Sequence, residues 1–242
     1  MSQRWNKKIG WMMGAVVVLV GVGAVKNGFP HLRTDSQARA VVGVPTVPTP
    51  YASITGAQSR TALAMLSTLA VKGRAAKTGY HRDLFGPAWA DTDRNGCDTR
   101  NDILARDLTG ETFRAGTRNC VVLSGEFVEP YTGRTVSFSK ADAGAVQIDH
   151  VVALSDAWQK GAQAWSAGKR LAFANDPLEL LAVDGPTNAA KSDGDAATWL
   201  PPNKAYRCAM VARQVAVKAK YGLWVTSAER DAVSRVLGSC AG

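Results

Sequence analysis

Val146-Gln147-Ile148-Asp149-His150-Val151-Val152 is the stretch of sequence that decides the fold. Its first three residues are strand-like, and a carboxylate and an imidazole stand where that strand is expected to end. A neutral imidazole can take a proton from water near pH 7, because its unperturbed pKa is about 6.5. In an ideally extended strand Asp149 and His150 point to opposite sides, so both reach one metal ion only if the strand ends or bulges there. Taken alone, the dipeptide favours a structural histidine over a catalytic one.

A second segment, Thr187-Asn188-Ala189-Ala190-Lys191, carries groups that complement this dipeptide. We expect Thr187 to cap a helix whose first turn carries Asn188. The amide oxygen of Asn188 and the carboxylate of Asp149 suit Mg²⁺ or a similar hard ion, with water and phosphate in the remaining positions. Lys191 lies on the same helical face as Asn188 and is expected to contact a phosphate. The plainer interpretation is a polar turn and a solvated lysine.

Between these segments lies Asn175-Asp176-Pro177-Leu178-Glu179, just before a predicted strand over residues 178–183. The Asn175 side chain is expected to bridge the loop backbone and hold the His150 strand in place. Apolar spacing and turn residues predict the other elements. These are a helix over 57–69, a short helix or turn over 103–108, a hairpin over 121–138, a long helix over 203–221 with a buried stripe of Tyr206, Met210, Val217 and Tyr221, and a last helix over about 226–237.

The first residues are typical of a targeting segment. Arg4, Lys7 and Lys8 precede an uncharged, mostly apolar run over residues 9–25. A positive start before an apolar core fits a secretory signal, and the run is also close to the shortest membrane span of about 17 residues. We therefore expect a signal peptide or membrane anchor over 1–26, a proline-rich linker over 27–51, and one folded domain over 52–242 outside the cytoplasm.

The four cysteines agree with export, because disulfides persist in oxidising compartments. None of them is spaced C-x-x-C, so a zinc ribbon is disfavoured. We favour the pairs Cys97–Cys120 and Cys208–Cys240, since each closes a modest loop, and four free buried thiols are the alternative.

The net charge of +9 says less about a partner than it suggests, because four bases and no acid lie in residues 1–30. The local charge matters more: Lys204, Arg207, Arg213, Lys218 and Lys220 lie in 200–228 without an acid. Three of them, Lys204, Arg207 and Lys218, share one helical face that we expect to follow a phosphate backbone, with a solvated face as the alternative.

A polar loop upstream resembles a calcium-binding loop in part, with Asp91, Asp93, Asn95 and Asp102 as the acidic and amide positions. Calcium is disfavoured, because Asp98 stands where such loops carry an apolar residue and two flanking amphipathic helices are not evident. We expect instead a disulfide-pinned loop beside the catalytic cleft, in which Arg100 faces a phosphate or pairs with an acid.

Taken together, these segments resemble the HNH, or ββα-metal, nuclease superfamily, and within it the GmrSD-like branch with exported members. The resemblance rests on the three segments around Asp149-His150, Asn175 and Asn188, and Arg82 to Leu108 also looks like the upstream part of those members. It covers roughly residues 60–240. The fold it implies is α+β, a ββα-metal (HNH) core with flanking helices and an N-terminal hairpin and loop region.

The resemblance implies a role for each motif residue. His150 would be the general base, Asp149 and Asn188 would bind one divalent metal ion, and Asn175 would order the loop. Asn188 replaces a histidine of the family pattern, which leaves the choice of metal open between Mg²⁺, the first expectation, and Mn²⁺ or another ion. Lys191, Arg100, Lys204 and Arg207 are the expected contacts to substrate.

The leading interpretation is therefore an exported, metal-dependent endonuclease that hydrolyses phosphodiester bonds with weak sequence specificity. DNA is favoured over RNA as the substrate, and no protein partner is predicted. The rival interpretation is a non-catalytic, envelope-associated binding protein that reuses an HNH-like fold.

Overall fold

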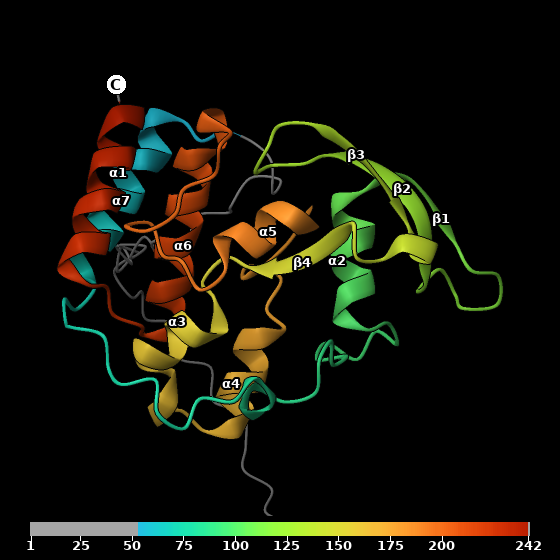
Figure 1. Ribbon diagram of the computed structural model, residues 1–242, viewed down its shortest axis with the longest axis horizontal. Coiled ribbons are helices and arrows are strands. Elements are labelled where there is room, and N and C mark those ends of the chain that lie inside the picture. Colours follow the sequence, from blue (N-terminus) through green and yellow to red (C-terminus); the bar gives the residue numbers. More distant parts are fainter. Residues whose placement is uncertain (1–52, 242) are drawn as a thin grey trace, which may run out of the picture. The chain divides into compact units, whose positions relative to one another are not determined.

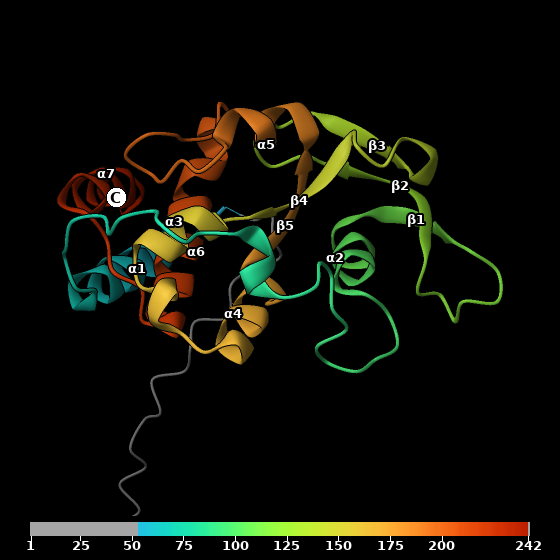
Figure 2. The same ribbon diagram turned by 60° about the horizontal axis from the view of Figure 1, so that its bottom comes forward.

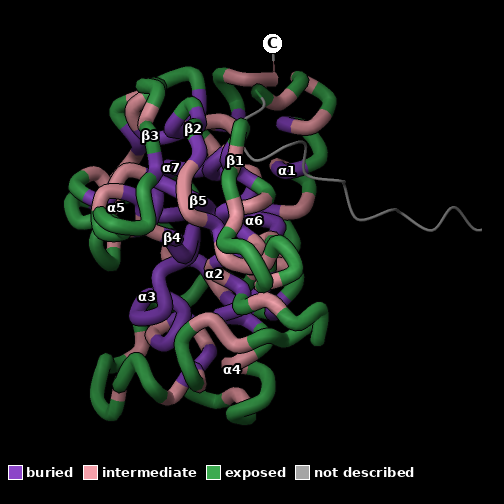
Figure 3. Tube along the Cα trace, turned by 90° about the vertical axis from the view of Figure 1, so that its right-hand side faces the viewer, coloured by how far each residue is buried: buried purple, intermediate pink, exposed green. Residues whose placement is uncertain are grey.

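Two short antiparallel strands, β4 (Val146–His150) and β5 (Leu180–Asp184), lie at the centre of the computed structural model, which describes residues 53–241. Along β5, Leu180 and Ala182 enter one hydrophobic cluster, while Leu181 and Val183 enter another. The strand pair is therefore covered on both faces, and Figure 3 shows β5 as largely buried. A strand buried on both faces typically consists of consecutive apolar residues, as β5 does up to Val183.

Helix α5 (Gly185–Lys191) follows β5 directly and packs against both strands. It begins earlier than the sequence suggested, so the expected cap at Thr187 is wrong. The cap is Asp184, whose carboxylate accepts hydrogen bonds from the backbone N–H and the hydroxyl of Thr187. A carboxylate is a strong N-cap, and a proline in the first turn starts the helix at no cost in hydrogen bonds. Asn188 consequently lies one turn into the helix.

On the other side of the strand pair, α2 (Thr99–Asp107) contacts both β5 and the three-stranded sheet, as Figure 2 shows. That sheet is antiparallel in the order β1-β2-β3, with β1 at Thr109–Phe113, β2 at Val122–Val128 and β3 at Thr135–Ser139. The predicted hairpin is confirmed as β2 and β3. The pattern missed β1, since its residues are mostly exposed and carry little apolar alternation.

Three helices form a separate layer: α1 (Gly56–Thr68), α6 (Arg207–Tyr221) and α7 (Ser227–Cys240) pack against one another (Figure 1). The predicted helices at these places are confirmed, as is the buried stripe on the long one. Gly222 ends α6 with φ +71°, a left-handed conformation that glycine adopts without strain.

The chain between β4 and β5 forms α3 (Leu154–Gln159) and α4 (Ala167–Ala174), two short helices that the sequence pattern did not reveal. A single turn of 3-10 helix, η1 (Arg82–Phe85), contacts both of them. The end of α4 meets the end of β4, where the backbone carbonyl of Ala174 contacts the ring of His150. The mixture of helices and sheets confirms the α+β class.

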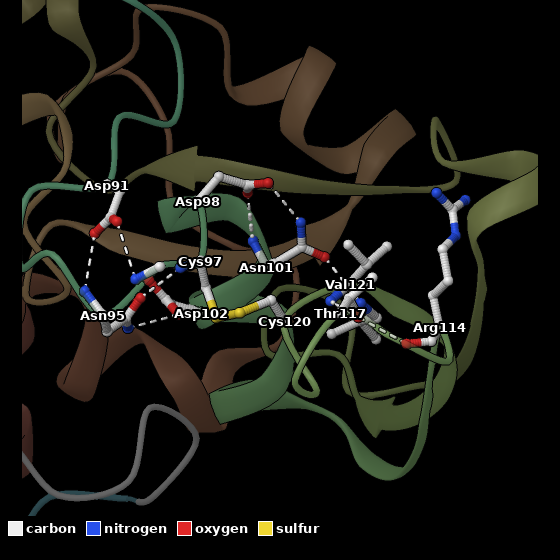
Figure 4. Close-up of a disulfide and its surroundings, with 12 residues drawn as sticks. Asp91, Asn95, Cys97, Asp98, Asn101, Asp102, Arg114, Thr117, Cys120 and Val121 are labelled. Atoms are coloured by element: carbon white, nitrogen blue, oxygen red, sulfur yellow. Dashed lines mark hydrogen bonds between the residues drawn. A yellow bond between two sulfur atoms is a disulfide. The ribbon is translucent and has the colours of Figure 1, made fainter.

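The cysteines form Cys97–Cys120 and Cys208–Cys240, the pairing that the loop lengths favour. Each bridge typically stabilises a fold by about 2–4 kcal/mol. Figure 4 shows the first bridge beside the calcium-like loop, where Asp91 accepts hydrogen bonds from the backbone N–H groups of Asn95 and Gly96. Backbone N–H groups of the loop itself thus satisfy the Asp91 carboxylate.

The helices that the structure describes contradict the expectation of a transmembrane segment. Within residues 53–241, none combines the length and the apolar character that a bilayer crossing requires. The apolar run over 9–25, the proposed leader over 1–26 and the linker over 27–51 lie outside the described residues.

A buried cluster of charges ties the helices together. The ammonium of Lys160, at the end of α3, lies 2.7–2.8 Å from carboxylates of Asp156, Asp195 and Glu229. Lys218 of α6 also pairs with Asp156 and Glu229, and both lysine side chains are almost fully buried. Burial of such charges is tolerated only because each finds partners of opposite sign.

Replacing Lys160 with Met should therefore lower the free energy of unfolding by about 3–5 kcal/mol, because three carboxylates lose their shared cation. Urea denaturation measures the change. Lys77→Met is the matched control, since it breaks a half-exposed pair with Asp193 and should cost no more than about 1 kcal/mol. Equal losses in the two variants would contradict the role given to the cluster.

Candidate active site

The three residues expected to act together, Asp149, His150 and Asn188, line one cavity of about 200 Å³. We call it the polar cavity; Arg82, Tyr80 and Asp193 also line it. Asp149 and His150 come from the end of β4, and Asn188 comes from α5, which lies against that strand. The fold thus brings the motif residues to one place although they are far apart in the chain.

Asp149 is held from two sides. One carboxylate oxygen accepts a hydrogen bond from the ammonium of Lys191 at 2.9 Å, and the other accepts one from the hydroxyl of Tyr131. Burial, and the neighbouring charge of Asp149, raise the pKa of Tyr131 well above its usual value, so the phenol stays protonated and donates. The carboxylate therefore has a fixed orientation.

Lys191 holds the end of β4, whereas the sequence predicts that it contacts a phosphate. Its ammonium also donates to the backbone carbonyl of His150 at 2.9 Å, and the side chain is fully buried. Lys191 does not line the polar cavity. In this structure the residue positions Asp149 and the backbone beside it.

His150 is buried and has its ring fixed in a defined way. Its Nε2 lies 3.0 Å from the backbone carbonyl of Ala174 at the end of α4. Burial first, then the positive charges of Arg82 and Lys191, lower the pKa of His150 to about 3, so the ring is neutral at ordinary pH. A carbonyl only accepts, so the proton sits on Nε2 and Nδ1 keeps its lone pair.

Asn188 is oriented by a neighbour on β4. Its amide nitrogen donates to Oε1 of Gln147 at 2.9 Å, which leaves the amide oxygen as the free end of the group. A carboxylate has about four lone-pair positions, so Asp149 keeps room for a cation beside Lys191 and Tyr131. One carboxylate and one amide oxygen fit an ion such as Mg²⁺, which retains several waters. Residues 53–241 hold no cluster of three or more His, Cys, Asp or Glu side chains for a closed metal site.

The segment 175–179 orders the loop after His150, through different groups from those expected. The buried Asn175 side chain donates to the carbonyl of Leu171 in its own helix, at 3.0 Å. The loop contact comes from Glu179, whose carboxylate accepts from the N–H of Val152. Burial, with Asp149 nearby, raises the pKa of Glu179 well above its usual value. The sequence reasoning missed this glutamate.

The basic residues proposed for substrate lie away from the polar cavity. Arg100 donates to the backbone carbonyls of Ala143 and Val146 at 3.1 and 2.9 Å, which fixes the start of β4. Arg207 donates to the carbonyl of Pro201, and Lys204 is exposed on the preceding turn. Neither lines the polar cavity.

The expected basic face of α6 is wrong for Lys218. That side chain is 2% exposed and pairs with Asp156 and Glu229, so it does not belong to a solvent-facing stripe. Arg213 is also buried, and its guanidinium binds three backbone carbonyls between Pro177 and Leu180. Helical spacing identified a common face but could not show which acids cover it.

Arg82 is the cation that does line the polar cavity, and its side chain is exposed. The sequence showed it only as part of a polar run, because nothing in that run indicates a contact with the end of β4. Tyr131, which fixes Asp149, was likewise visible only as a turn residue.

Comparison with known proteins agrees with the motif. Residues 98–236 match the family described as GmrSD restriction endonucleases, C-terminal domain. A protein of Arthroderma benhamiae, described as an uncharacterized secreted protein, is 39% identical over 182 residues, which is 74% of this chain and 85% of the relative. No solved structure matches. The matched span includes Asp149, His150, Asn175 and Asn188, and the resemblance named from the sequence is confirmed.

The state of the His150 ring can be measured directly. With a folded pKa of about 3, the ring should stay neutral and carry its proton on Nε2 throughout the range from about pH 5 to pH 8. Nitrogen-15 NMR of the metal-free protein reports both the tautomer and the charge, and His150→Gln assigns the signal. A midpoint near pH 6.5, or a proton on Nδ1, would contradict the geometry.

Proposed function

The chain belongs to the family of GmrSD restriction endonuclease C-terminal domains, and from this premise we propose that it is an exported, metal-dependent endonuclease. It hydrolyses phosphodiester bonds in nucleic acid, DNA in preference to RNA, with weak sequence specificity. The observation that supports this most strongly is the meeting of Asp149, His150 and Asn188 on one polar cavity. A base and two oxygen ligands are the minimum for metal-assisted hydrolysis.

The proposed catalytic core consists of β4, β5 and α5, in the strand-strand-helix order of a ββα-metal nuclease. Two features support it. The strands are antiparallel neighbours, and the helix that follows packs on both of them. The general base lies at the end of the first strand, and an amide ligand lies on the helix.

His150 is the proposed general base. The Ala174 carbonyl holds the proton on Nε2, so Nδ1 is the nitrogen that takes a proton from the attacking water. Because its pKa is about 3 in the metal-free site, the ring is already in its basic form. A low pKa makes it a weaker base, so the charges of substrate must raise its affinity for the proton during the reaction.

Asp149 and Asn188 are the proposed ligands of one divalent ion, Mg²⁺ first and Mn²⁺ as the next choice. When bound, the ion supplies electrostatic stabilisation of the charge on the phosphate and the leaving oxygen. Lys191 and Tyr131 keep the Asp149 carboxylate in place, and Arg82 contributes a positive charge at the cavity wall. Asn175 keeps a supporting role at the end of α4.

Export is supported by the two disulfides and by a relative described as secreted. Residues 1–26 would then serve as a signal peptide and 27–51 as a linker to the nuclease domain. Nucleic acid is the proposed partner. Lys204, on the turn before α6, and Arg207, the first residue of α6, are proposed to contact its backbone outside the cavity, since Lys204 is exposed.

His150→Ala should slow cleavage by about 10²- to 10⁴-fold, the usual contribution of a positioned general base. The assay follows nicking of plasmid DNA and cutting of RNA with Mg²⁺, with Mn²⁺ and with EDTA, and circular dichroism checks the fold. His81→Ala is the matched control, because that histidine is exposed and does not line the polar cavity. Cleavage that survives EDTA or the His150 change would refute the mechanism, and no cleavage at all would favour the non-catalytic binding protein.

A further inference from the structure

A second cavity, of about 390 Å³, adjoins the polar one. We call it the apolar cavity: its wall runs along residues 85–89 and across Ala174 and Asn175. Arg82, His150 and Leu154 line both cavities. A volume in the range of about 300–1,000 Å³ with a mostly apolar wall is typical of a site for a small organic group. The mechanism above makes no use of this space.

We propose that the apolar cavity receives one unstacked nucleobase of the strand whose phosphate lies in the polar cavity. The inference rests on the proposed function and names its substrate class: single-stranded, or locally unpaired, nucleic acid. A nucleotide has a charged end and a flat heterocycle with apolar faces. The two cavities offer the matching environments side by side, with the imidazole of His150 between them.

Trp89 supplies the stacking surface. Its ring is nearly parallel to that of His150, at 15° with centroids 6.1 Å apart, and it lies in the wall of the apolar cavity. Its backbone has φ +58°, a left-handed conformation that is a true outlier for a bulky residue. Such strain is kept where a side chain must point in a required direction. Aromatic side chains stack on any base, so the cavity would not select a sequence.

Asn175 supplies a polar contact at the same wall. Its nitrogen is used by Leu171, while its oxygen is buried and has no hydrogen-bond partner in the part of the chain that the structure describes. A buried acceptor without a donor is unfavourable, and such groups call for an explanation. Every base carries an N–H on its pairing edge or its exocyclic amine, and that edge is free only when the base is unpaired.

Arg82 joins the two environments. Its exposed side chain lines both cavities, so its positive charge lies between the place proposed for the base and that proposed for the phosphate. A base within a duplex would have to leave the stack to enter, whereas an unpaired base would not. Single strands should therefore be bound and cut faster than duplexes of the same sequence.

The test compares two single-stranded hexamers of equal charge, one with bases and one with an abasic sugar-phosphate backbone. Binding is measured by fluorescence anisotropy in EDTA, with deoxyribose and ribose versions of each. The wild-type chain should bind the base-bearing hexamer at least about 5-fold more tightly, the fold-change that matches the lower end of base-aromatic stacking for one base. Equal affinities for the two hexamers would overturn the proposal.

Two variants assign the effect to the Trp89 ring. Trp89→Leu keeps apolar bulk but removes the flat face, so it should lose most of the preference for bases and leave the abasic affinity unchanged. Trp89→Phe keeps a flat face and should retain the preference. If both variants weaken both hexamers alike, Trp89 acts only on the fold and the proposal fails.

Cleavage assays with Mg²⁺ and Mn²⁺ separate this proposal from the proposed endonuclease function on which it rests. Base-dependent binding without any cleavage would refute the endonuclease and leave the base cavity standing. Cleavage that proceeds equally on base-bearing and abasic hexamers would support the endonuclease and overturn the base cavity. Faster cutting of a single strand than of its hairpin duplex is the result expected if both are right.

Discussion

The buried pair of Lys191 and Asp149 is the contact on which the site depends. It joins the last residue of α5 to the end of β4, and the same ammonium holds the backbone carbonyl of His150. Two buried charges are costly to desolvate, and the cost is offset only when every remaining donor and acceptor is used. Here Tyr131 takes the second carboxylate oxygen. The pair thus fixes the Asp149 carboxylate, the strand end at His150, and the helix that carries Asn188.

The chain between β4 and β5 provides the second half of the frame. It leaves the strand end, forms α3 and α4, and returns so that the Ala174 carbonyl meets the imidazole and Glu179 binds the loop that follows it. The Ala174 carbonyl decides which ring nitrogen carries the proton. The same segment contributes Leu154 to both cavities and Ala174 and Asn175 to the apolar one, so the proposed catalysis and the proposed recognition of a base share one scaffold.

The sequence predicted those features that depend on local pattern. A strand ending at Asp149-His150, the hairpin, the three outer helices and the family followed from spacing and from short motifs. What it could not predict depends on partners far along the chain. Lys191 and Lys218 look like solvated cations until Asp149, Asp156 and Glu229 are brought beside them by other elements. Arg82 and Trp89 lie in a polar run with no signal for a cavity. Thr187 and Asp184 are both residue types that cap helices, and only the hydrogen bonds of the folded chain select Asp184.

We propose that Asp149 and Asn188 hold a cation within reach of His150, and anomalous diffraction from crystals soaked in Mn²⁺ can locate that ion. We expect one manganese peak in the polar cavity, bonded to one oxygen from each of the two residues, with Nδ1 of His150 facing a water or phosphate beside it. A peak elsewhere with none in the cavity, or a cation bound through His150 itself, would refute the proposed arrangement.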